Sequence, residues 1–401
     1  MFLLQDIFTA YLDCRKNKRN TVNALNFELN LENNLIKLYQ DIKSRKYKVE
    51  TSICFIVNKP VKREIFAGNF RDRIIHHFII NKLNQYFEKS LLYDSYSCRK
   101  EKGTLFGVSR VKKFIRQCSN NYQKDCWILK MDIQGFFMHI DKNILYKQVW
   151  LYLWQERLNN NFDDEDFEVL DYLIKKVIFN DPTKNYIKKS PLEEWDGLPS
   201  SKSLFNSNEN CGLPIGNLTS QIFANVYMNT FDKWIKDELK VEFYGRYVDD
   251  FLIIHQNKEF LLNLIPKIKE FLQDKLKLTL HPKKIYFQHY SKGIQFLGTT
   301  ILPFRTFASK KIRNSFYNCV KEFVNEPNKE EKIKQLENKV FSYMGVLSKS
   351  KNYKFIKKTI YPLRKLAKEN QEIDTFVKKL DKWITKRKFR RSGTFTVPLV
   401  N

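Results

Sequence analysis

The chain has 401 residues, with 71 Lys and Arg against 44 Asp and Glu, which gives a formal net charge of +27. Hydrophobic residues make up 43% and aromatic residues 15%, while Gly and Pro number only 12 and 11. This composition excludes a disordered chain and a small disulfide-stapled domain, and the length predicts two or three subdomains. The charge predicts a polyanionic partner.

The sequence predicts neither a membrane anchor nor a structural metal site. No apolar run reaches the roughly 18 residues of a membrane helix. Gln5 and Asp6 interrupt the apolar start, which favours an amphipathic helix over a signal peptide, so we expect a cytoplasmic protein. The cysteines show no CxxC pair or zinc spacing and are expected to be thiols in a reducing compartment. They are Cys14, Cys54, Cys98, Cys118, Cys126, Cys211 and Cys319.

The first half of the chain alternates helical and strand-like patterns. Residues 1–50 carry apolar side chains at helical spacing, whereas residues 51–66 are rich in β-branched and aromatic residues around an Asn-Lys-Pro turn, which predicts a basic hairpin. The acidic run 163–168 is expected to begin a helix rather than to bind a cation. The further predictions are a helix over 71–90, a strand ending at Trp127–Met131, helices over 142–179 and a long polar loop over 180–211.

The second half begins with a helix that starts after Gly216 and runs to about Leu239, for which Asn217 or Thr219 is the expected cap. Residues 351–401 hold 15 basic and 4 acidic side chains, which predicts either a phosphate-binding surface or a merely soluble basic helix pair. The further predictions are a hairpin over 242–255, a helix over 258–275, a hairpin over 284–302 and mainly helices from Ser309 to Lys386.

Three carboxylates lie in apolar surroundings, where the charged form of the side chain is energetically unfavourable. Asp132 ends an apolar strand, and Asp249 and Asp250 lie at the centre of a hairpin with apolar flanks. Such acids repel each other and lose hydration unless cations neutralise them. Two Mg²⁺ ions about 3.5–4 Å apart, as in phosphoryl transfer, would do so. The alternative at this point is an ordinary turn, because Asp tolerates turn geometry.

Five motifs in order over residues 130–300 resemble the palm of reverse transcriptases. Tyr247-Val-Asp-Asp250 is similar to their YxDD box, and Asp132 with Phe137 is similar to their first palm motif. The other three are Gly212–Gln221, Leu280–Lys284 and Phe296–Gly298.

Local signatures narrow the resemblance to the reverse transcriptases of diversity-generating retroelements. The similarity covers about residues 15–355, and the last 45 residues match nothing that we can name. The signatures are Ile215–Gln221, Phe70–His77, Tyr93–Tyr96 with Cys98–Lys100, Leu198-Pro199 with Lys202–Phe205, and Ser342–Gly345.

The resemblance implies an α+β right-hand polymerase with fingers, an antiparallel palm sheet with helices, and a helical thumb. Residues 1–125 would form an N-terminal extension and the fingers. Residues 126–305 would form the palm, with inserted helices at about 142–211. Residues 306–401 would form a basic thumb and tail that grips an RNA–DNA duplex.

The resemblance also implies residue roles. Asp132, Asp249 and Asp250 would hold two Mg²⁺ ions, or Mn²⁺, with help from the backbone carbonyl of Ile133. Lys284 would protonate departing pyrophosphate. Phe137 would be the steric gate against ribonucleotides, with a core aromatic as the alternative. The deoxynucleotide (dNTP) would also meet Lys62, Arg63, Arg71, Arg73 and Gln221, and the primer and template would meet Tyr247, Gly216 and Asn217.

Ile215 departs from the Gln of many reverse transcriptases. An aliphatic side chain cannot hydrogen-bond to the nascent pair, and in the resembled family this goes with copying errors at template adenines; the alternative is that Ile215 only fills apolar space. Arg63 would share in setting fidelity.

The resemblance implies that the biological role is cDNA synthesis in the cytoplasm of a bacterium or phage host. The implied partners are a template RNA, its RNA–DNA heteroduplex and a basic, oligomeric helical-bundle accessory protein. Two rivals remain: a retron or phage-defence reverse transcriptase, and a non-catalytic RNA-binding protein on a polymerase fold.

Overall fold

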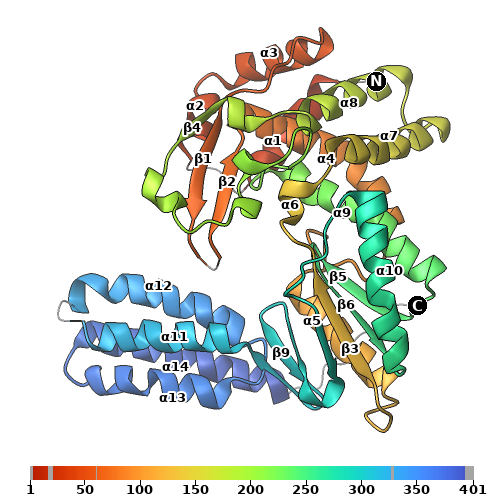
Figure 1. Ribbon diagram of the computed structural model, residues 1–401. Coiled ribbons are helices and arrows are strands. Elements are labelled where there is room, and N and C mark those ends of the chain that lie inside the picture. Colours follow the sequence, from red (N-terminus) through yellow and green to blue (C-terminus); the bar gives the residue numbers. More distant parts are fainter. Residues whose placement is uncertain (1–2, 17–20, 60, 327–328, 393–401) are drawn as a thin grey trace. The chain divides into compact units, whose positions relative to one another are not determined.

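The computed structural model describes residues 3–16, 21–59, 61–326 and 329–392 (Figure 1). The chain divides into two compact units, which are described separately. The first comprises Met1–Arg110 and Cys126–Gln288, and the second comprises Val111–Asp125 and His289–Asn401. The functional division into fingers, palm and thumb at 125 and 305 stays a prediction.

Helices form the N-terminal part of the first unit, as the apolar spacing predicts. Ile7, Ala10 and Cys14 recur at helical intervals and are buried against the long helix α4, so their spacing explains which face of α1 packs inward. The side chain of Asn69 caps α4 by accepting from the backbone N–H of Arg71. The helices are α1 (Leu4–Arg15), α2 (Val22–Glu28), α3 (Leu31–Lys43) and α4 (Phe70–Ser90).

The predicted basic hairpin is confirmed. Strands β1 (Ser52–Val57) and β2 (Arg63–Ala67) pair antiparallel, from Ile53 opposite Ala67 to Val57 opposite Arg63. A third strand, β4 (Tyr186–Lys188), pairs parallel with β1. The expectation of a plain loop over 180–211 was therefore wrong in part, because β4 and several short 3₁₀ turns lie within it.

A four-stranded sheet in the order β5-β6-β3-β7 carries the acidic residues. Its two central strands, β3 and β6, are mostly buried, and α10 packs against both of them. A strand that is buried on both faces needs apolar side chains at nearly every position, which explains the almost continuous apolar runs in the sequence. The predicted hairpin over 242–255 is confirmed, with Tyr247 opposite Asp250. The strands are β3 (Trp127–Asp132), β5 (Phe243–Tyr247), β6 (Asp250–His255) and β7 (Tyr286–His289).

The predicted hairpin over 284–302 was wrong in its first part and confirmed in its second, where β8 and β9 pair antiparallel. Strand β7 joins β3, and a 3₁₀ turn with Gly293 at φ +75° separates it from a second antiparallel sheet of order β10-β9-β8. The hairpin turn lies instead at Leu297 and Gly298, both at positive φ, as a type I′ turn requires. The strands of the second sheet are β8 (Ile294–Phe296), β9 (Thr299–Leu302) and β10 (Arg305–Ala308).

The remaining helices of the first unit support the sheet and the hairpin. Asp163 caps α8 by accepting from the N–H of Asp166, which confirms that the acidic run begins a helix. Asn217 stands at the cap position of α9, but its side chain does not cap. Helix α9 continues into a π-helical turn (Trp234–Glu238), and α5 (Thr104–Cys118) runs from the first unit into the second. The remaining helices of the first unit are α6 (Phe136–His139), α7 (Lys142–Leu158), α8 (Asp164–Ile178), α9 (Leu218–Lys233) and α10 (Lys258–Leu276).

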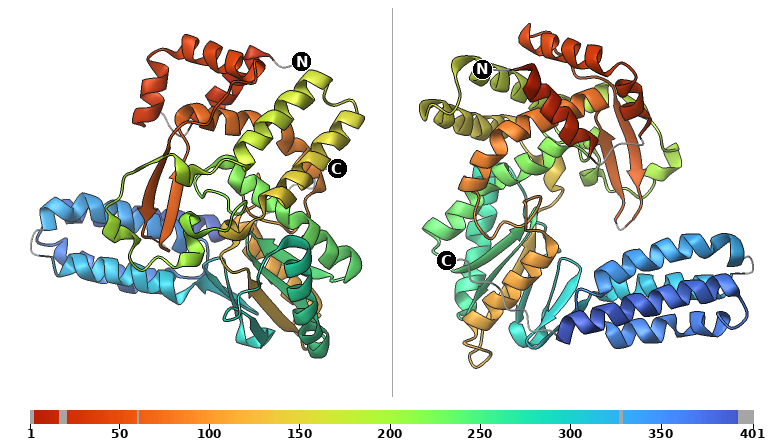
Figure 2. Two further views of the ribbon diagram at one scale, coloured as in Figure 1. Left: turned by 45° about the horizontal axis from the view of Figure 1, so that its top comes forward. Right: turned by 180° about the vertical axis from the view of Figure 1, so that it is seen from behind.

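Four helices with a core of their own form most of the second unit, as expected from Ser309 onward (Figure 2). They are α11 (Lys310–Val324), α12 (Lys329–Leu347), α13 (Tyr353–Leu366) and α14 (Gln371–Ser392). The end of the basic segment, residues 393–401, lies outside the described residues. In the described part of the chain, no helix is both long and apolar enough to span a membrane. The mixture of helices and antiparallel sheets confirms the α+β class.

Candidate active site

The fold brings the three predicted acids together in the first unit. Asp132, the last residue of β3, lies directly opposite Asp250, the first residue of β6. Asp249 precedes it in the turn between β5 and β6, and its carbonyl accepts a 3.2 Å hydrogen bond from the N–H of Ile133. The antiparallel register therefore joins two sequence motifs that are more than a hundred residues apart.

The surroundings disfavour the charged forms of two of these acids. Burial raises the pKa of Asp249 to about 6, and the nearby charge of Asp132 adds to this effect. Burial likewise raises the pKa of Asp250 to about 7, against the opposing charge of Lys130, whose Nζ lies 3.3 Å from Asp250 Oδ2. The Nζ atom of Lys284 lies 2.8 Å from Asp132 Oδ1. Two lysines thus partly neutralise the three carboxylates.

The donor set suits a hard divalent cation. Oδ1 of Asp250 is buried and has no hydrogen-bond partner, so a cation there would satisfy an otherwise orphaned acceptor. Mg²⁺ prefers oxygen ligands of this kind. The side chains of the described residues do not, however, form any cluster of three or more His, Cys, Asp or Glu that could hold a metal together. Asp132, Asp249, Asp250 and the carbonyl of Ile133 remain predicted ligands.

The turn that carries Asp249 has an unusual backbone. Tyr247 pairs with Asp250, so Val248 and Asp249 form a two-residue hairpin loop. Val248 has φ +58°, a left-handed conformation that a β-branched residue rarely adopts. A positive φ at the first loop position is the pattern of a type II′ turn, where Gly is usual.

The predicted nucleotide-binding cations of the β1–β2 hairpin differ in their surroundings. Arg63 is exposed at the start of β2, and its positive charge opposes the rise in the pKa of Asp249. The Nζ atom of Lys62 instead donates to the carbonyl of Asp196 at 2.6 Å. Of the two, Arg63 is the one that acts electrostatically on the acids.

The two predicted arginines of α4 are engaged elsewhere. Arg71 donates to Asp41 Oδ2 at 2.8 Å and to the carbonyl of Lys48, and its guanidinium covers the ring of Tyr47. Arg73 donates to the carbonyl of Gly68 at 2.9 Å. These contacts make both side chains structural in the described state, and their nucleotide-binding roles stay predictions.

Phe137 and Ile215 lie against the same small apolar cluster, which consists of Cys54, Phe66, Met138 and Leu204. Both are half-buried, so each presents part of its surface to solvent. The carbonyl of Ile215 accepts from the N–H of Phe66 at 2.9 Å, which holds it beside β2. The structure therefore brings together the predicted steric gate and the predicted fidelity residue.

The residues after Ile215 are fixed by close packing. A Cβ at Gly216, which has φ +128°, would meet the side chain of Ile65 at 2.9 Å. The Oδ1 atom of Asn217 accepts from the N–H of Gly68 at 3.1 Å. Gln221 is exposed on α9 and accepts from the thiol of Cys98.

Residues 58–301, more than half of the chain, match the reverse transcriptase (RNA-dependent DNA polymerase) family. The chain belongs to this family. The COX1/OXI3 intron 2 protein of Saccharomyces cerevisiae is 20% identical over 59% of this chain and 30% of its own length. The intron 1 protein of the same organism is 23% identical over 62% of this chain and 25% of its own. This reverse transcriptase chain thus spans less than a third of the curated relatives that it matches.

Two solved structures are similar at low identity. Telomerase from Candida albicans, in complex with a fragment of telomeric RNA, has a TM-score of 0.47 at 11% identity, over 84% of this chain and 61% of its own. Apo telomerase from Candida tropicalis has a TM-score of 0.45 at 12% identity, over 84% of this chain and 66% of its own.

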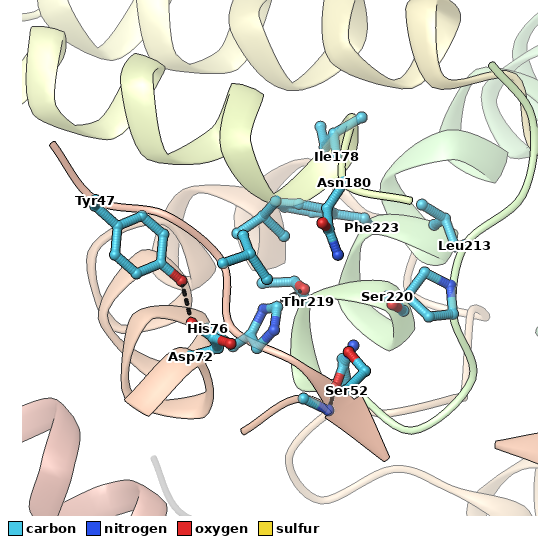
Figure 3. A pocket seen from close by; sticks show the side chains of 15 residues that line it. Tyr47, Ser52, Asp72, His76, Ile178, Asn180, Leu213, Thr219, Ser220 and Phe223 are labelled. Carbon is cyan, nitrogen blue, oxygen red and sulfur yellow. Dashed lines mark hydrogen bonds between the residues drawn. The ribbon is translucent and has the colours of Figure 1, made fainter. Parts of the chain in front are cut away.

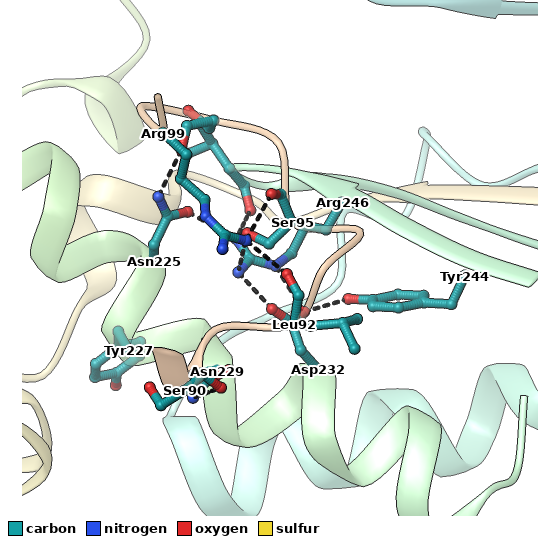
Figure 4. A network of polar contacts seen from close by, with 12 residues as sticks. Ser90, Leu92, Ser95, Arg99, Asn225, Tyr227, Asn229, Asp232, Tyr244 and Arg246 are labelled. Atoms are coloured by element: carbon teal, nitrogen blue, oxygen red, sulfur yellow. Dashed lines mark hydrogen bonds and ion pairs between the residues drawn. The ribbon is translucent and has the colours of Figure 1, made fainter. Parts of the chain in front are cut away.

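Two buried polar networks of the reverse transcriptase domain were missed by the sequence reasoning. Arg246 and Asp232 form an ion pair without solvent exposure (Figure 4). Glu64, buried on β2, accepts from Trp195, Ser203 and the N–H of Leu204, and so fastens the long loop to the strand that begins at Arg63. The available signal was a charged residue within an otherwise apolar strand.

A small cavity lined by both polar and apolar side chains lies beside α4 and α9 (Figure 3). Its volume of about 20 Å³ suits a single water molecule rather than a substrate. Asp72 accepts from the hydroxyl of Tyr47 at 2.6 Å, and His76 shares a 2.8 Å hydrogen bond with Thr219. Burial raises the pKa of Asp72 to about 6 and lowers that of His76 to about 3. This cavity is therefore too small to be the substrate site.

Proposed function

We propose that this chain is an RNA-directed DNA polymerase that makes cDNA by two-metal nucleotidyl transfer. The observation that carries the proposal is the cross-strand register that sets Asp132 opposite Asp250, with Asp249 in the adjoining turn. This arrangement lies wholly within the region that matches the reverse transcriptase family.

The chemistry divides among the residues of the site. Bound Mg²⁺, or Mn²⁺ in its place, would lower the pKa of the primer hydroxyl and stabilise the departing pyrophosphate. Asp132, Asp249 and Asp250 would hold these ions. Lys284, already paired with Asp132, would supply a proton to the leaving group.

Further residues would select and orient the nucleotide. The exposed guanidinium of Arg63 would contact the triphosphate, since Arg binds phosphate in a bidentate manner. Phe137 would reject a 2′-hydroxyl by its bulk, and Ile215 beside it would leave the nascent base pair without a hydrogen-bonding check. The four basic helices from α11 to α14 would grip the RNA–DNA duplex by its phosphates as the thumb.

The narrower proposal is error-prone cDNA synthesis at template adenines in a diversity-generating retroelement. It rests on the local sequence signatures, above all Ile215–Gln221. The template RNA and a basic oligomeric accessory protein would be its partners, and the host cytoplasm its location. The names of the curated relatives refer to introns, so an intron-type programme competes with this proposal and with the retron type.

Primer extension on an RNA template with Mg²⁺ tests the activity. We expect dNTP incorporation by the unaltered chain and none above background by Asp249→Asn. Asp274→Asn, an exposed Asp on α10, is the matched control and should remain active. RNA binding without any incorporation by the unaltered chain would favour the non-catalytic alternative instead. Sequencing of the cDNA then separates the programmes, because substitutions opposite template adenines support the retroelement.

A further inference from the structure

The buried pair of Arg246 and Asp232 connects α9 to strand β5. Nε and Nη2 of Arg246 donate to the two carboxylate oxygens of Asp232 at 2.7 and 2.6 Å (Figure 4). Neither side chain has any solvent exposure. The hydroxyl of Tyr244 also donates to Asp232, at 2.6 Å. The guanidinium is therefore fixed in position.

All five donors of this guanidinium have an acceptor. Besides the two bonds to Asp232, Nη2 donates to the hydroxyl of Ser95 at 3.3 Å. Nη1 donates to Oδ1 of Asn225 at 3.4 Å and to the carbonyl of Val248 at 2.9 Å. Lysine has three donors on one nitrogen and cannot reproduce this planar pattern.

The bond to Val248 links this buried pair to the acidic turn. Val248 is the residue with φ +58°, and Asp249 and Asp250 follow it directly. A β-branched residue stays in such a conformation only where its surroundings fix it. The Arg246 guanidinium supplies a fixed donor from inside the protein at this point.

We propose that Arg246, oriented by Asp232, is a positioning residue that sets the backbone of the Val248–Asp249 turn and thereby the direction of the Asp249 and Asp250 carboxylates. The proposal rests on the proposed function, since its consequence is a weaker divalent cation site when the clamp is lost. Stability alone does not account for the pair, because buried ion pairs are often replaceable by apolar residues of similar volume without loss of stability.

The experiment compares the unaltered chain with three variants. Arg246→Met combined with Asp232→Leu replaces the buried pair by apolar side chains, and Arg246→Lys keeps the charge but loses the five-donor pattern. Arg15→Met removes another bidentate Arg–carboxylate pair, to Glu28 on α2, and serves as the control.

Three measurements distinguish a positioning role of Arg246 from a purely structural one. Thermal unfolding shows whether each variant is folded. Backbone cleavage near Asp249 by Fe²⁺ with ascorbate and peroxide, in competition with Mg²⁺, reports cation binding without turnover. Primer extension gives kcat and KM separately for the dNTP.

With Fe²⁺ kept below the concentration that saturates the site, we expect Arg246→Lys, and the double variant if it folds, to need about 10–100-fold more Mg²⁺ to suppress cleavage, because loss of a group that orients a ligand weakens metal sites by this factor. We expect kcat to fall with little change in KM, while Arg15→Met behaves as the unaltered chain. A folded Arg246→Lys with unaltered Mg²⁺ competition and kcat would overturn the positioning role. If the unaltered chain shows neither cleavage near Asp249 nor incorporation, the proposed function itself fails.

Discussion

The Nζ atom of Lys284 lies 2.8 Å from Oδ1 of Asp132, although 152 positions separate the two residues. The lysine side chain is about half exposed, whereas the aspartate is mostly buried. The pair holds the lysine ammonium group against the acidic cluster, and the proton-donating role of Lys284 belongs to the proposed function. A half-exposed pair of this kind contributes at most about 1 kcal/mol to folding.

Lys284→Ala should therefore impair chemistry more than stability. We expect kcat for dNTP incorporation to fall by about 10²-fold, the usual contribution of a general acid, with a shift in the melting temperature of no more than a few degrees. Steady-state primer extension and thermal unfolding measure the two effects. Lys283→Ala, the exposed neighbour, is the control and should change neither. Equal kcat values for the two variants would remove the catalytic role.

Glu64→Ala should loosen the loop that Glu64 fastens to β2. The substitution leaves three buried or half-buried donors without their acceptor, and each lost partner costs about 1–3 kcal/mol. Hydrogen exchange should become faster in residues 190–206, and KM for the dNTP should rise because Arg63 adjoins Glu64. Glu193→Ala, an exposed acid in the same loop, should leave both unchanged. Slow exchange in the Glu64 variant would contradict this account.

His76 should make the fold sensitive to acid. Burial lowers its pKa to about 3 in the folded chain, with Arg73 and His77 adding to the effect, whereas an unfolded His titrates near 6.5. Between these values the unfolded state binds more protons, so the contribution of His76 to stability is lost as the pH falls from about 6.5 towards 3. Asp72, with a pKa raised to about 6, acts in the opposite direction between about 4 and 6.

The comparison with His76→Gln isolates this contribution, since Asp72 is present in both chains. We expect the free energy of unfolding of the unaltered chain to fall, relative to the variant, by up to about 1.4 kcal/mol per pH unit below pH 6. Urea unfolding at several pH values measures the difference. A difference independent of pH would mean that His76 is protonated in the folded chain or exposed.

The sequence predicts individual helices and strands better than it predicts which strands pair with each other. The alternation of residues 51–66 and the apolar flanks of Asp249 and Asp250 are local signals, and both hairpins are present. The fate of β7 depends on pairing with β3, more than 150 residues earlier, which no local pattern records. The first strand of the 284–302 prediction failed for that reason, whereas the β8–β9 hairpin in its second part is present.

The same limit applies to the site. The three acids could be named from their spacing and flanks, but the lysines that neutralise them could not all be found. Lys130 is one residue among 71 basic ones, and only the β3–β6 register brings it to Asp250. Arg71 shows the opposite error. Its position in the sequence predicts a contact with the nucleotide, whereas in the structure its side chain forms an ion pair with Asp41.

Ile215→Gln tests the origin of the proposed infidelity. Ile215 is half-buried against the same apolar cluster as Phe137, and its carbonyl accepts from the N–H of Phe66, so the longer polar side chain has solvent on one side and need not disturb the backbone. A glutamine amide would restore hydrogen bonding to the nascent pair. We expect fewer substitutions opposite template adenines, with the rate of synthesis changed less than the error spectrum. Deep sequencing of cDNA made on one defined RNA template measures this. Ile215→Leu keeps the apolar character and should retain the unaltered spectrum, and identical spectra for the Gln and Leu variants would show that Ile215 only fills apolar space.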